Sequence, residues 1–228
     1  MEFVFMLTRG DRTVENCLEV LEEIAPLGLA HIGFKDIGVP PETLRRLTAA
    51  IRRSGARVYM EVVSDSGDAA RRSAVLGREL AVDCLLGGTQ VAETLRLLEG
   101  SAVTYYPFAG RPSGHPTRLG GSPGSVEADA LSFVSAGCAG CDLLAYRATE
   151  ADPLELVRAA RRGVGAGKLI VAGSVSSGAQ VRALAAAGAD AFTIGSAVFE
   201  HAYAPSRPSL KAQLKAVLAD CRPAASAD

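Results

Sequence analysis

Short apolar runs alternate with amphipathic stretches along the whole chain. Eight of the runs have the length of strands, and several are apolar throughout, as expected of parallel strands buried on both faces. The eight runs cover residues 2–7, 30–35, 57–63, 82–86, 103–108, 141–146, 169–172 and 191–194. The pattern therefore predicts a parallel sheet whose strands are connected by helices.

The segments between these runs carry helical spacing and helix-end signals. In residues 14–25, apolar side chains recur at intervals of three and four positions. Residues 152–155 read Asp-Pro-Leu-Glu, which supplies an N-cap, a proline in the first turn and a capping-box acid. Ser177 and Gln180 offer a second capping box, and Gly188 is placed to end that helix. Repeated strand–helix units imply right-handed crossovers between parallel strands.

Eight such units in 228 residues predict the α/β class and a single (β/α)₈ TIM barrel. No dinucleotide-binding glycine fingerprint is found, which favours closure of the sheet over an open doubly wound arrangement. No linker or shift in composition marks a second domain, so we expect residues 1–228 to form one. Residues 109–124, rich in Gly, Pro and Ser, form a long irregular stretch after the fifth strand. They are expected at the carboxyl-end mouth, where barrel active sites are built.

Charge and hydropathy narrow the class of protein further. The formal net charge is −1 and the signs are mixed, which argues against a broad nucleic-acid-binding surface. No apolar run approaches the roughly 18 residues of a membrane span. The apolar start lacks a basic lead and a small-residue cleavage site, so it reads as a strand and not as a signal peptide. We therefore expect a cytoplasmic protein without a membrane or nucleic-acid partner.

Two Gly/Ser turns follow the last two predicted strands, Gly173-Ser174 after the seventh and Gly195-Ser196 after the eighth. A phosphate needs several backbone N–H groups that converge without side-chain obstruction, and glycine allows that close approach. The loops after strands seven and eight are the usual phosphate site of this barrel. A single such turn would equally suit a simple tight turn, but two in adjacent units predict phosphate binding at these four residues.

The segment from Lys168 to Phe199 resembles the ribulose-phosphate-binding barrels. That group includes the histidine-pathway isomerase and cyclase, the tryptophan-pathway barrels and the pentulose-phosphate epimerases. The resemblance covers the segment that contains both Gly/Ser turns, while the rest of the chain matches only in strand–helix rhythm. It implies a barrel fold and a phosphorylated, often sugar-derived, substrate.

This chain departs from the known members of the group in its acidic residues. The histidine-pathway isomerase has Asp at the ends of strands one and five, where this chain reads Met6-Leu7-Thr8 and Tyr106-Pro107-Phe108. The Asp-x-Lys-x-x-Asp signature of the related decarboxylases is missing. The paired His and Asp ligands of the metal-dependent epimerases are not evident either. The resemblance therefore leaves the reaction open, and the sequence implies no metal and no cofactor.

Charged residues near the ends of strands two and three are the main candidates for chemistry. Lys35 ends the second predicted strand and Glu61 lies in the third. A lone buried charge is costly, so we expect the two to pair or to face the wet barrel mouth. The pair is either a structural ion pair or an acid–base pair acting beside a carbonyl. A desolvated lysine forming a Schiff base is a further alternative.

Other candidates lie around the predicted mouth. His115, in the long loop, is a candidate proton shuttle, although a solvated loop histidine fits the sequence equally well. Candidate substrate-binding residues at or after other strands are Asp36, Gly87, Arg111 and Arg147. Asp83 and Asp142 fall near the starts of their predicted strands, so we expect structural roles for them low in the barrel.

Together these features predict an enzyme of phosphorylated metabolites derived from sugars, of the phosphosugar isomerase or carbon–carbon lyase type. The alternative from another class is a barrel that binds a phosphometabolite without turning it over, as a sensor or partner subunit, because a fold does not dictate function. The expected partner is a small phosphorylated molecule. A homodimer is a further expectation, drawn only from the fold class.

Overall fold

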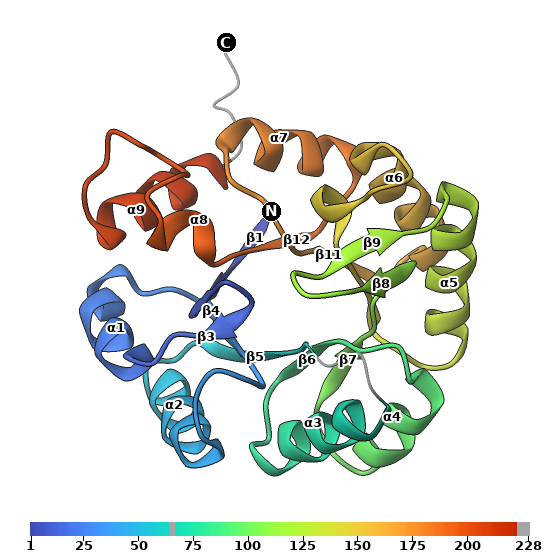
Figure 1. Ribbon diagram of the computed structural model, residues 1–228, viewed down its shortest axis with the longest axis horizontal. Helices are drawn as coiled ribbons and strands as arrows, with labels where there is room; N and C mark the ends of the chain where they lie inside the picture. Colours follow the sequence, from blue (N-terminus) through green and yellow to red (C-terminus); the bar gives the residue numbers. More distant parts are fainter. Residues whose placement is uncertain (64–66, 223–228) are drawn as a thin grey trace.

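Eight parallel strands form a barrel in the computed structural model, which describes residues 1–63 and 67–222 (Figure 1). Their order around the barrel is β10-β11-β12-β1-β4-β5-β6-β7. The strands are β1 Glu2–Met6, β4 His31–Lys35, β5 Arg57–Val62, β6 Cys84–Gly87, β7 Thr104–Tyr106, β10 Gly140–Leu143, β11 Lys168–Val171 and β12 Ala191–Ile194. The predicted α/β barrel is therefore confirmed.

Helices surround the barrel, one or more after each strand (Figure 1). They are α1 Cys17–Ile24, α2 Pro41–Arg53, α3 Gly67–Glu79, α4 Val91–Leu98, α5 Pro123–Ser135, α6 Pro153–Val164, α7 Gly178–Ala187, α8 Ser196–Phe199 and α9 Leu210–Asp220, with 3₁₀ turns η1 Ala25–Leu27 and η2 Ala145–Arg147. Asp152 and Ser177 are N-caps as predicted, but the second capping box is shifted by one residue, because Gln180 Oε1 accepts from Ser176 N–H over 2.7 Å and not from Ser177 N–H. The Asp152 carboxylate accepts hydrogen bonds from two amides of α6, and the Ser177 hydroxyl accepts one from Gln180 N–H in α7.

The barrel closes between β7 and β10 through main-chain contacts just beyond β7. Asp142 N–H donates to Pro107 O over 2.9 Å, and Ala109 N–H donates to Asp142 O over 3.0 Å. A bridge pairs Phe108 with Asp142 in parallel. Asp142 therefore joins the two ends of the sheet by its backbone, while its side chain is free to point inward.

Strand residues alternate between two cores, as the pleat of a strand requires. One face of each strand packs against the helices, and the other lines the barrel interior. The interior cluster consists of Val4, Met6, Tyr59, Cys84, Leu86, Tyr106, Ile170 and Ala191. Lys35, Glu61, Asp142 and Thr193 each follow a helix-facing residue, so they share the inward face and lie nearer the carboxyl end than most of that cluster.

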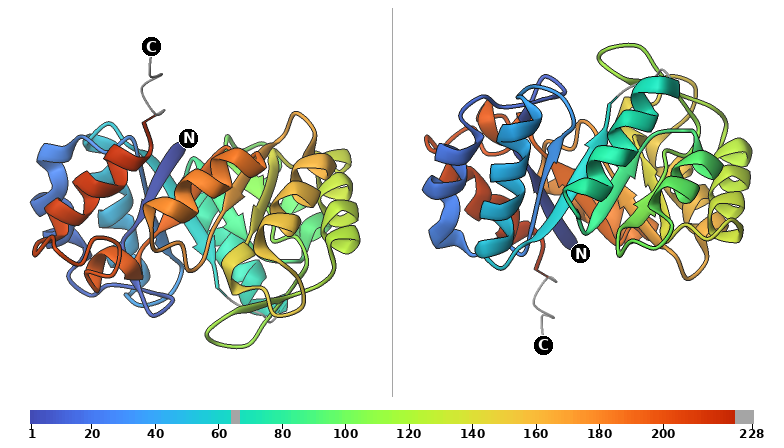
Figure 2. Two further views of the ribbon diagram at one scale, coloured as in Figure 1. Left: turned by 90° about the horizontal axis from the view of Figure 1, so that it is seen from above. Right: turned by 90° about the horizontal axis from the view of Figure 1, so that it is seen from below.

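Two small hairpins stand at the carboxyl end, and neither was predicted. Strands β2 Thr8–Arg9 and β3 Arg12–Thr13 form one, and β8 Arg111–Ser113 and β9 Arg118–Gly120 form the other. The second hairpin projects from the end of the barrel opposite the N-terminus (Figure 2). It replaces the irregular loop expected for residues 109–124, because β8 and β9 pair in antiparallel register.

The close packing of α5 on α6 gives a first prediction. Gly163 lies on α6 where an added Cβ would stand 2.3 Å from the main-chain oxygen of Glu127 in α5. Alanine would improve the helix propensity by about 1 kcal/mol, but it would force the two helices apart. We expect Gly163→Ala to lower the free energy of unfolding in urea by about 1–3 kcal/mol. Gly124→Ala, whose Cβ meets nothing closer than 4.0 Å, serves as control. An equal effect of both substitutions would contradict this packing.

Candidate active site

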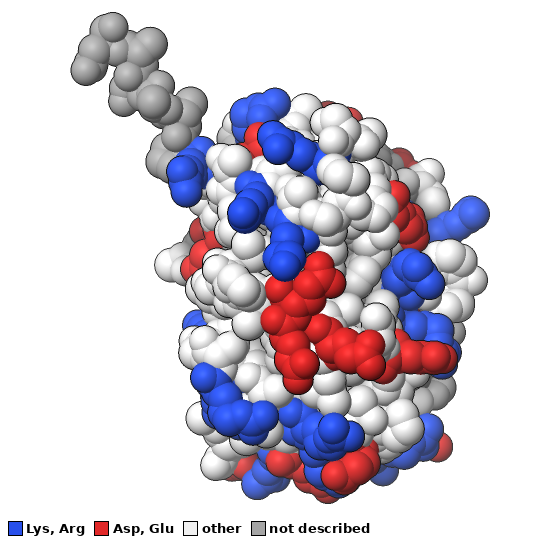
Figure 3. Space-filling view, turned by 90° about the vertical axis from the view of Figure 1, so that its left-hand side faces the viewer, with Lys and Arg blue, Asp and Glu red and all other residues white. Residues whose placement is uncertain are grey.

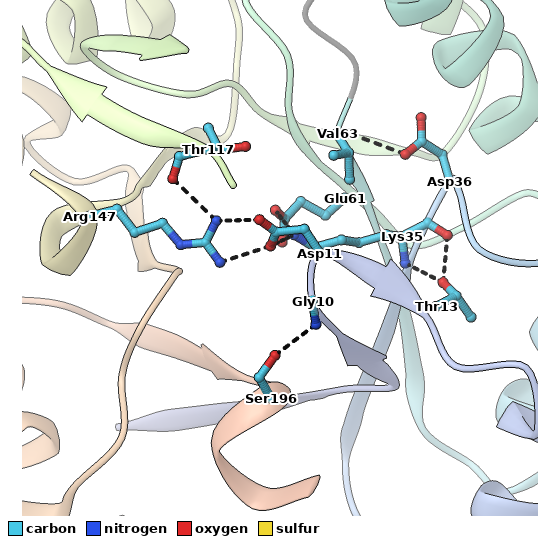
Figure 4. A network of polar contacts seen from close by, with 10 residues as sticks. All are labelled: Gly10, Asp11, Thr13, Lys35, Asp36, Glu61, Val63, Thr117, Arg147 and Ser196. Atoms are coloured by element: carbon cyan, nitrogen blue, oxygen red, sulfur yellow. Dashed lines mark hydrogen bonds and ion pairs between the residues drawn. The ribbon is translucent and has the colours of Figure 1, made fainter. Parts of the chain in front are cut away.

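A buried ion network occupies the carboxyl end of the barrel (Figure 4). The Lys35 ammonium donates a hydrogen bond to Asp11 Oδ1 over 2.7 Å and lies 3.0 Å from Glu61 Oε1. Arg147 holds the other side of Asp11, with its two terminal nitrogens 2.7 and 2.8 Å from the carboxylate oxygens. The side chains of Lys35, Asp11 and Glu61 are 7%, 4% and 6% exposed. The predicted contact between Lys35 and Glu61 is therefore present, as part of a larger network.

Local structure places each member of the network. Lys35 and Glu61 are register partners on the adjacent strands β4 and β5. Asp11 lies in the turn of the β2–β3 hairpin, where Gly10 and Asp11 both have positive φ, 55° and 59°. Positive φ at both central residues is the requirement of the tight hairpin turn that matches strand twist. The Thr13 hydroxyl fastens this hairpin to β4, accepting from Lys35 N–H over 2.9 Å and donating to Lys35 O over 2.7 Å.

The charges in the network shift the pKa of its members. Burial alone would lower the pKa of Lys35, but the adjacent carboxylates of Glu61 and Asp11 outweigh it and raise that pKa. Burial would raise the pKa of Asp11, but the hydrogen bonds and charges of Arg147 and Lys35 hold it well below its usual range. Lys35 is therefore a cation and Asp11 an anion at neutral pH.

The Gly/Ser turns line the same cavity as the ion network. The cavity has a volume of about 280 Å³. Its wall includes the ion-network residues Asp11, Lys35, Glu61 and Arg147 together with Thr8, Thr193, Gly173, Ser174, Val175, Gly195, Ser196 and Glu200. Residues at the carboxyl ends of strands from the first to the last of the barrel therefore line one cavity.

The Gly173-Ser174 turn requires its glycine for two reasons. Gly173 has φ +75°, and a Cβ there would stand 2.7 Å from Arg147 Nε. Ser174 also has a positive φ, 60°, which is uncommon outside glycine and concentrates at functional sites. Within residues 1–63 and 67–222, the main-chain N–H groups of Gly173, Ser174 and Val175 form no hydrogen bond. These amides are available to an anion in the cavity.

The Gly195-Ser196 turn is held against the β2–β3 hairpin. A Cβ on Gly195 would lie 2.4 Å from Thr8 Oγ1 and 2.6 Å from Thr8 O, so this glycine is required by packing. The Ser196 hydroxyl accepts a hydrogen bond from Gly10 N–H over 3.1 Å, which ties the turn to the β2–β3 hairpin (Figure 4). Ser196 begins α8, so its amide has no acceptor within that helix.

Four sequence-derived candidates lie outside this cavity. Asp36 accepts hydrogen bonds from Val63 N–H over 3.1 Å and from the Ser73 hydroxyl, and it lines a separate cavity with His115. Arg111 is exposed on β8 and pairs with Glu150 at 2.8 Å. Gly87, with φ +79°, is packed under the Phe108 ring. The structure brings Lys35, Glu61 and Arg147 to the Gly/Ser turns, and the roles of all these residues stay predictions.

Three acidic residues of the site were not predicted: Asp11, Asp142 and Glu200, which lines the cavity. Asp11 was missed, although Gly-Asp between Thr-Arg and Arg-Thr is a hairpin-turn signal directly after the first strand. Asp142 was expected near the base of the barrel. The strand ends early, at Leu143, so Asp142 is its penultimate residue, and residues 145–147 form a 3₁₀ turn that brings Arg147 inward. Asp83 does lie at the amino end, accepting from Val58 N–H over 2.7 Å.

Asp142 is fully buried, and both its carboxylate oxygens lack a hydrogen-bond partner among the described residues. Burial raises its pKa well above the usual range, and the charge of Glu61 raises it further. The folded protein therefore keeps Asp142 protonated at a pH where the unfolded chain ionises it.

This raised pKa predicts how Asp142 affects stability with pH. The folded state binds the proton more tightly, so its contribution is full below the ordinary pKa of about 3.9 and is lost as pH rises through the folded value. In the wild type, the free energy of unfolding should fall by up to about 1.4 kcal/mol per pH unit within that window. Asn cannot ionise, so the Asp142→Asn variant should not show this loss. Urea unfolding from pH 4 to pH 8 should show the variant gaining on the wild type as pH rises. Parallel curves would contradict a protonated Asp142.

No protein-family model matches the chain, and no curated protein matches it in sequence. Solved structures do. Orotidine 5′-phosphate decarboxylase from Pyrococcus horikoshii is 15% identical with a TM-score of 0.65, covering 97% of this chain and 100% of that one. A chain of the tryptophan synthase complex from Pyrococcus furiosus is 14% identical with a TM-score of 0.67, covering 96% and 98%. The fold is that of a TIM barrel.

A third structure extends this likeness. FabK from Thermotoga maritima is 17% identical with a TM-score of 0.56, covering 85% of this chain and 58% of that one. At these identities the similarity concerns the fold, so the reaction has to be argued from the site.

The outer surface carries both signs of charge in separate groups. On the side that carries α1, α2 and α9, acidic residues gather between two groups of basic residues (Figure 3). Across residues 1–63 and 67–222, no helix is long and apolar enough to span a membrane. Neither observation tests the expected partners, so the homodimer and the absence of a nucleic-acid partner stay predictions.

Proposed function

We propose that this protein is an enzyme that binds a phosphorylated small metabolite and acts on it by acid–base chemistry, as an isomerase or a carbon–carbon lyase. The observation that carries the proposal is the meeting of the two Gly/Ser turns and the Lys35–Glu61 pair in one cavity of about 280 Å³. Two structural neighbours lend support by their names, since orotidine 5′-phosphate decarboxylase and tryptophan synthase are enzymes and the first acts on a phosphate compound.

The phosphate would lie between Gly173-Ser174 and Gly195-Ser196. The unpaired amides of the first turn, the Ser174 hydroxyl and the amide at the start of α8 are donors that a phosphate needs. Arg147 packs against Gly173, but both its terminal nitrogens bind Asp11, so the main-chain amides and the serine hydroxyl would be the main donors to the phosphate. Converging main-chain amides in a glycine-containing turn are a common way for proteins to bind a phosphate group.

The other half of the cavity would carry out the chemistry. The Glu61 carboxylate is placed to take a proton from a carbon next to a carbonyl, or from a hydroxyl beside a carbon–carbon bond. The Lys35 ammonium would donate a hydrogen bond to the carbonyl oxygen as negative charge develops there. Return of the proton to the neighbouring carbon completes an isomerisation, and release of the enolate fragment followed by its protonation completes a lyase reaction.

The state of Lys35 favours this acid–base role over a Schiff base. A lysine that attacks a carbonyl must be neutral, and such lysines have a depressed pKa. Two buried carboxylates raise the pKa of Lys35 instead. Borohydride reduction with a turned-over substrate should therefore leave no covalent adduct on Lys35, whereas a trapped adduct would establish the Schiff-base alternative.

Thermal-shift screening against sugar phosphates, followed by a turnover assay in deuterated water for each hit, tests the proposal. We expect stabilisation, product and incorporation of solvent deuterium, with Glu61→Gln retaining the shift and losing about 10²–10⁴-fold in rate. Stabilisation without product would favour the non-catalytic binding barrel. A lack of stabilisation by every phosphate compound would contradict both.

A further inference from the structure

Among residues 1–63 and 67–222, the cavity wall offers no unpaired positive charge. The wall holds two cations, Lys35 and Arg147, and three carboxylates, those of Asp11, Glu61 and Glu200. Lys35 lies within 3.0 Å of both Asp11 and Glu61, and Arg147 holds Asp11 with two hydrogen bonds. Each cation is therefore already paired before a substrate enters.

Asp142 does not alter this balance in favour of an anion. It is buried on the inward face of β10, where the charges of Glu61 and Lys35 act on its carboxyl group in opposite directions. Protonated, it adds no charge to the site, and ionised, it adds a further negative one. In both states an incoming anionic group would find only cations that carboxylates already neutralise.

Asp11 is the carboxylate that forms ion pairs with both cations. Its carboxylate lies between them, 2.7 Å from Lys35 Nζ and 2.7 Å from the nearer Arg147 nitrogen (Figure 4). The hairpin turn that carries it is fixed on both sides, by Thr13 to Lys35 and by Gly10 to Ser196. Asp11 is thus built into the cavity wall, where its carboxylate occupies the place that a second substrate anion would need.

We propose that Asp11 is a specificity-determining residue that restricts the substrate to one anionic group, the phosphate. The reacting end of the substrate is then uncharged, of the hydroxyl or carbonyl type, and a second phosphate or a carboxylate there is rejected. This rests on the proposed function, because it assumes that the Gly/Ser turns hold the phosphate. The physical reason is that a buried anion without a free cation loses its hydration without compensation.

A pair of matched three-carbon probes tests this restriction. Glycerol 3-phosphate and 3-phosphoglycerate share a phosphate and a hydroxyl, and they differ in a hydroxymethyl group against a carboxylate. By calorimetric titration we expect the wild-type protein to bind glycerol 3-phosphate at least about tenfold more tightly. In Asp11→Asn, 3-phosphoglycerate should gain about tenfold while glycerol 3-phosphate changes little, because the carboxylate can then pair with Arg147 and Lys35.

Controls separate the possible failures. Glu150→Gln removes an exposed carboxylate outside the cavity and should leave the preference unchanged. Equal or tighter binding of 3-phosphoglycerate by the wild type would overturn the inference. This measurement does not depend on whether any variant folds. An unchanged preference in Asp11→Asn would equally overturn it. If neither probe nor inorganic phosphate binds at all, the phosphate site itself fails, and with it the proposed function.

Discussion

Lys35→Met should lower the free energy of unfolding by about 3–5 kcal/mol at pH 7, as expected when one partner of a buried ion network is removed. The Asp11 and Glu61 carboxylates would remain buried, and only Arg147 would be left to compensate them. Catalytic turnover should be lost as well, since the ammonium that stabilises the developing oxyanion is gone. Urea unfolding of the wild type and the variant measures the first effect.

The deficit of Lys35→Met should depend on pH in a defined direction. Without the ammonium, a buried carboxylate is more easily protonated, so the folded variant takes up a proton that the unfolded chain releases. Its stability relative to the wild type should therefore recover as the pH falls from 7 towards 4. In the wild type, Asp11 has a depressed pKa, so its contribution is present above the ordinary value and is lost only at lower pH.

Lys168→Met is the matched control for this substitution. Lys168 also pairs with a carboxylate, that of Glu2, but the pair lies at the rim, with side chains 20% and 45% exposed. Such pairs contribute at most about 1 kcal/mol. A similar loss in both variants, or a loss below 1 kcal/mol in Lys35→Met, would contradict a buried network that the protein depends on.

Gly173→Ala should abolish the stabilisation that phosphate gives the protein. The wild type should gain about 2.7 kcal/mol at a phosphate concentration a hundred times the dissociation constant. In the variant, the Cβ would stand 2.7 Å from Arg147 Nε and strain a residue whose φ is +75°, so the turn cannot keep its amides aimed at the cavity. Thermal unfolding at increasing phosphate concentration measures the loss.

Gly55→Ala controls for backbone strain alone. Gly55 has φ +84°, but a Cβ there would meet nothing within 4 Å, and it precedes the amino end of β5, whereas the cavity lies at the carboxyl end. This variant should lose stability through strain and keep the full phosphate effect. Equal retention of the phosphate effect in Gly173→Ala would show that the anion does not bind at this turn.

The strand–helix rhythm was enough to predict the barrel because its strands are buried on both faces and its helices are capped by local signals. Residues 141–146 show the limit. Their apolar run predicted one long strand, but the chain leaves the sheet after Leu143. A short 3₁₀ turn then brings Arg147 to Asp11. An apolar run indicates that its residues are buried. It does not distinguish the end of a strand from a buried turn that follows it.

The contacts of the site that join consecutive strands were predictable from the sequence. Those that form only because the barrel closes on itself were not. Lys35 and Glu61 lie on consecutive strands, so their pairing follows from chain order. Asp11 and Arg147 are 136 positions apart, and they meet because the hairpin after β1 crosses the mouth towards the turn after β10. Asp142 falls near the start of the predicted run 141–146, which placed it low in the barrel, but β10 ends at Leu143 and makes Asp142 its penultimate residue. Such contacts depend on three-dimensional closure, which a linear pattern does not encode.

The proposed function depends most directly on where a phosphate binds. A crystal structure of the protein with glycerol 3-phosphate tests this in one measurement. We expect the phosphate between Gly173-Ser174 and Gly195-Ser196, with the glycerol hydroxyls directed at Lys35 and Glu61. A phosphate bound elsewhere, or a ligand whose carbon chain points away from the Lys35–Glu61 pair, would contradict the account.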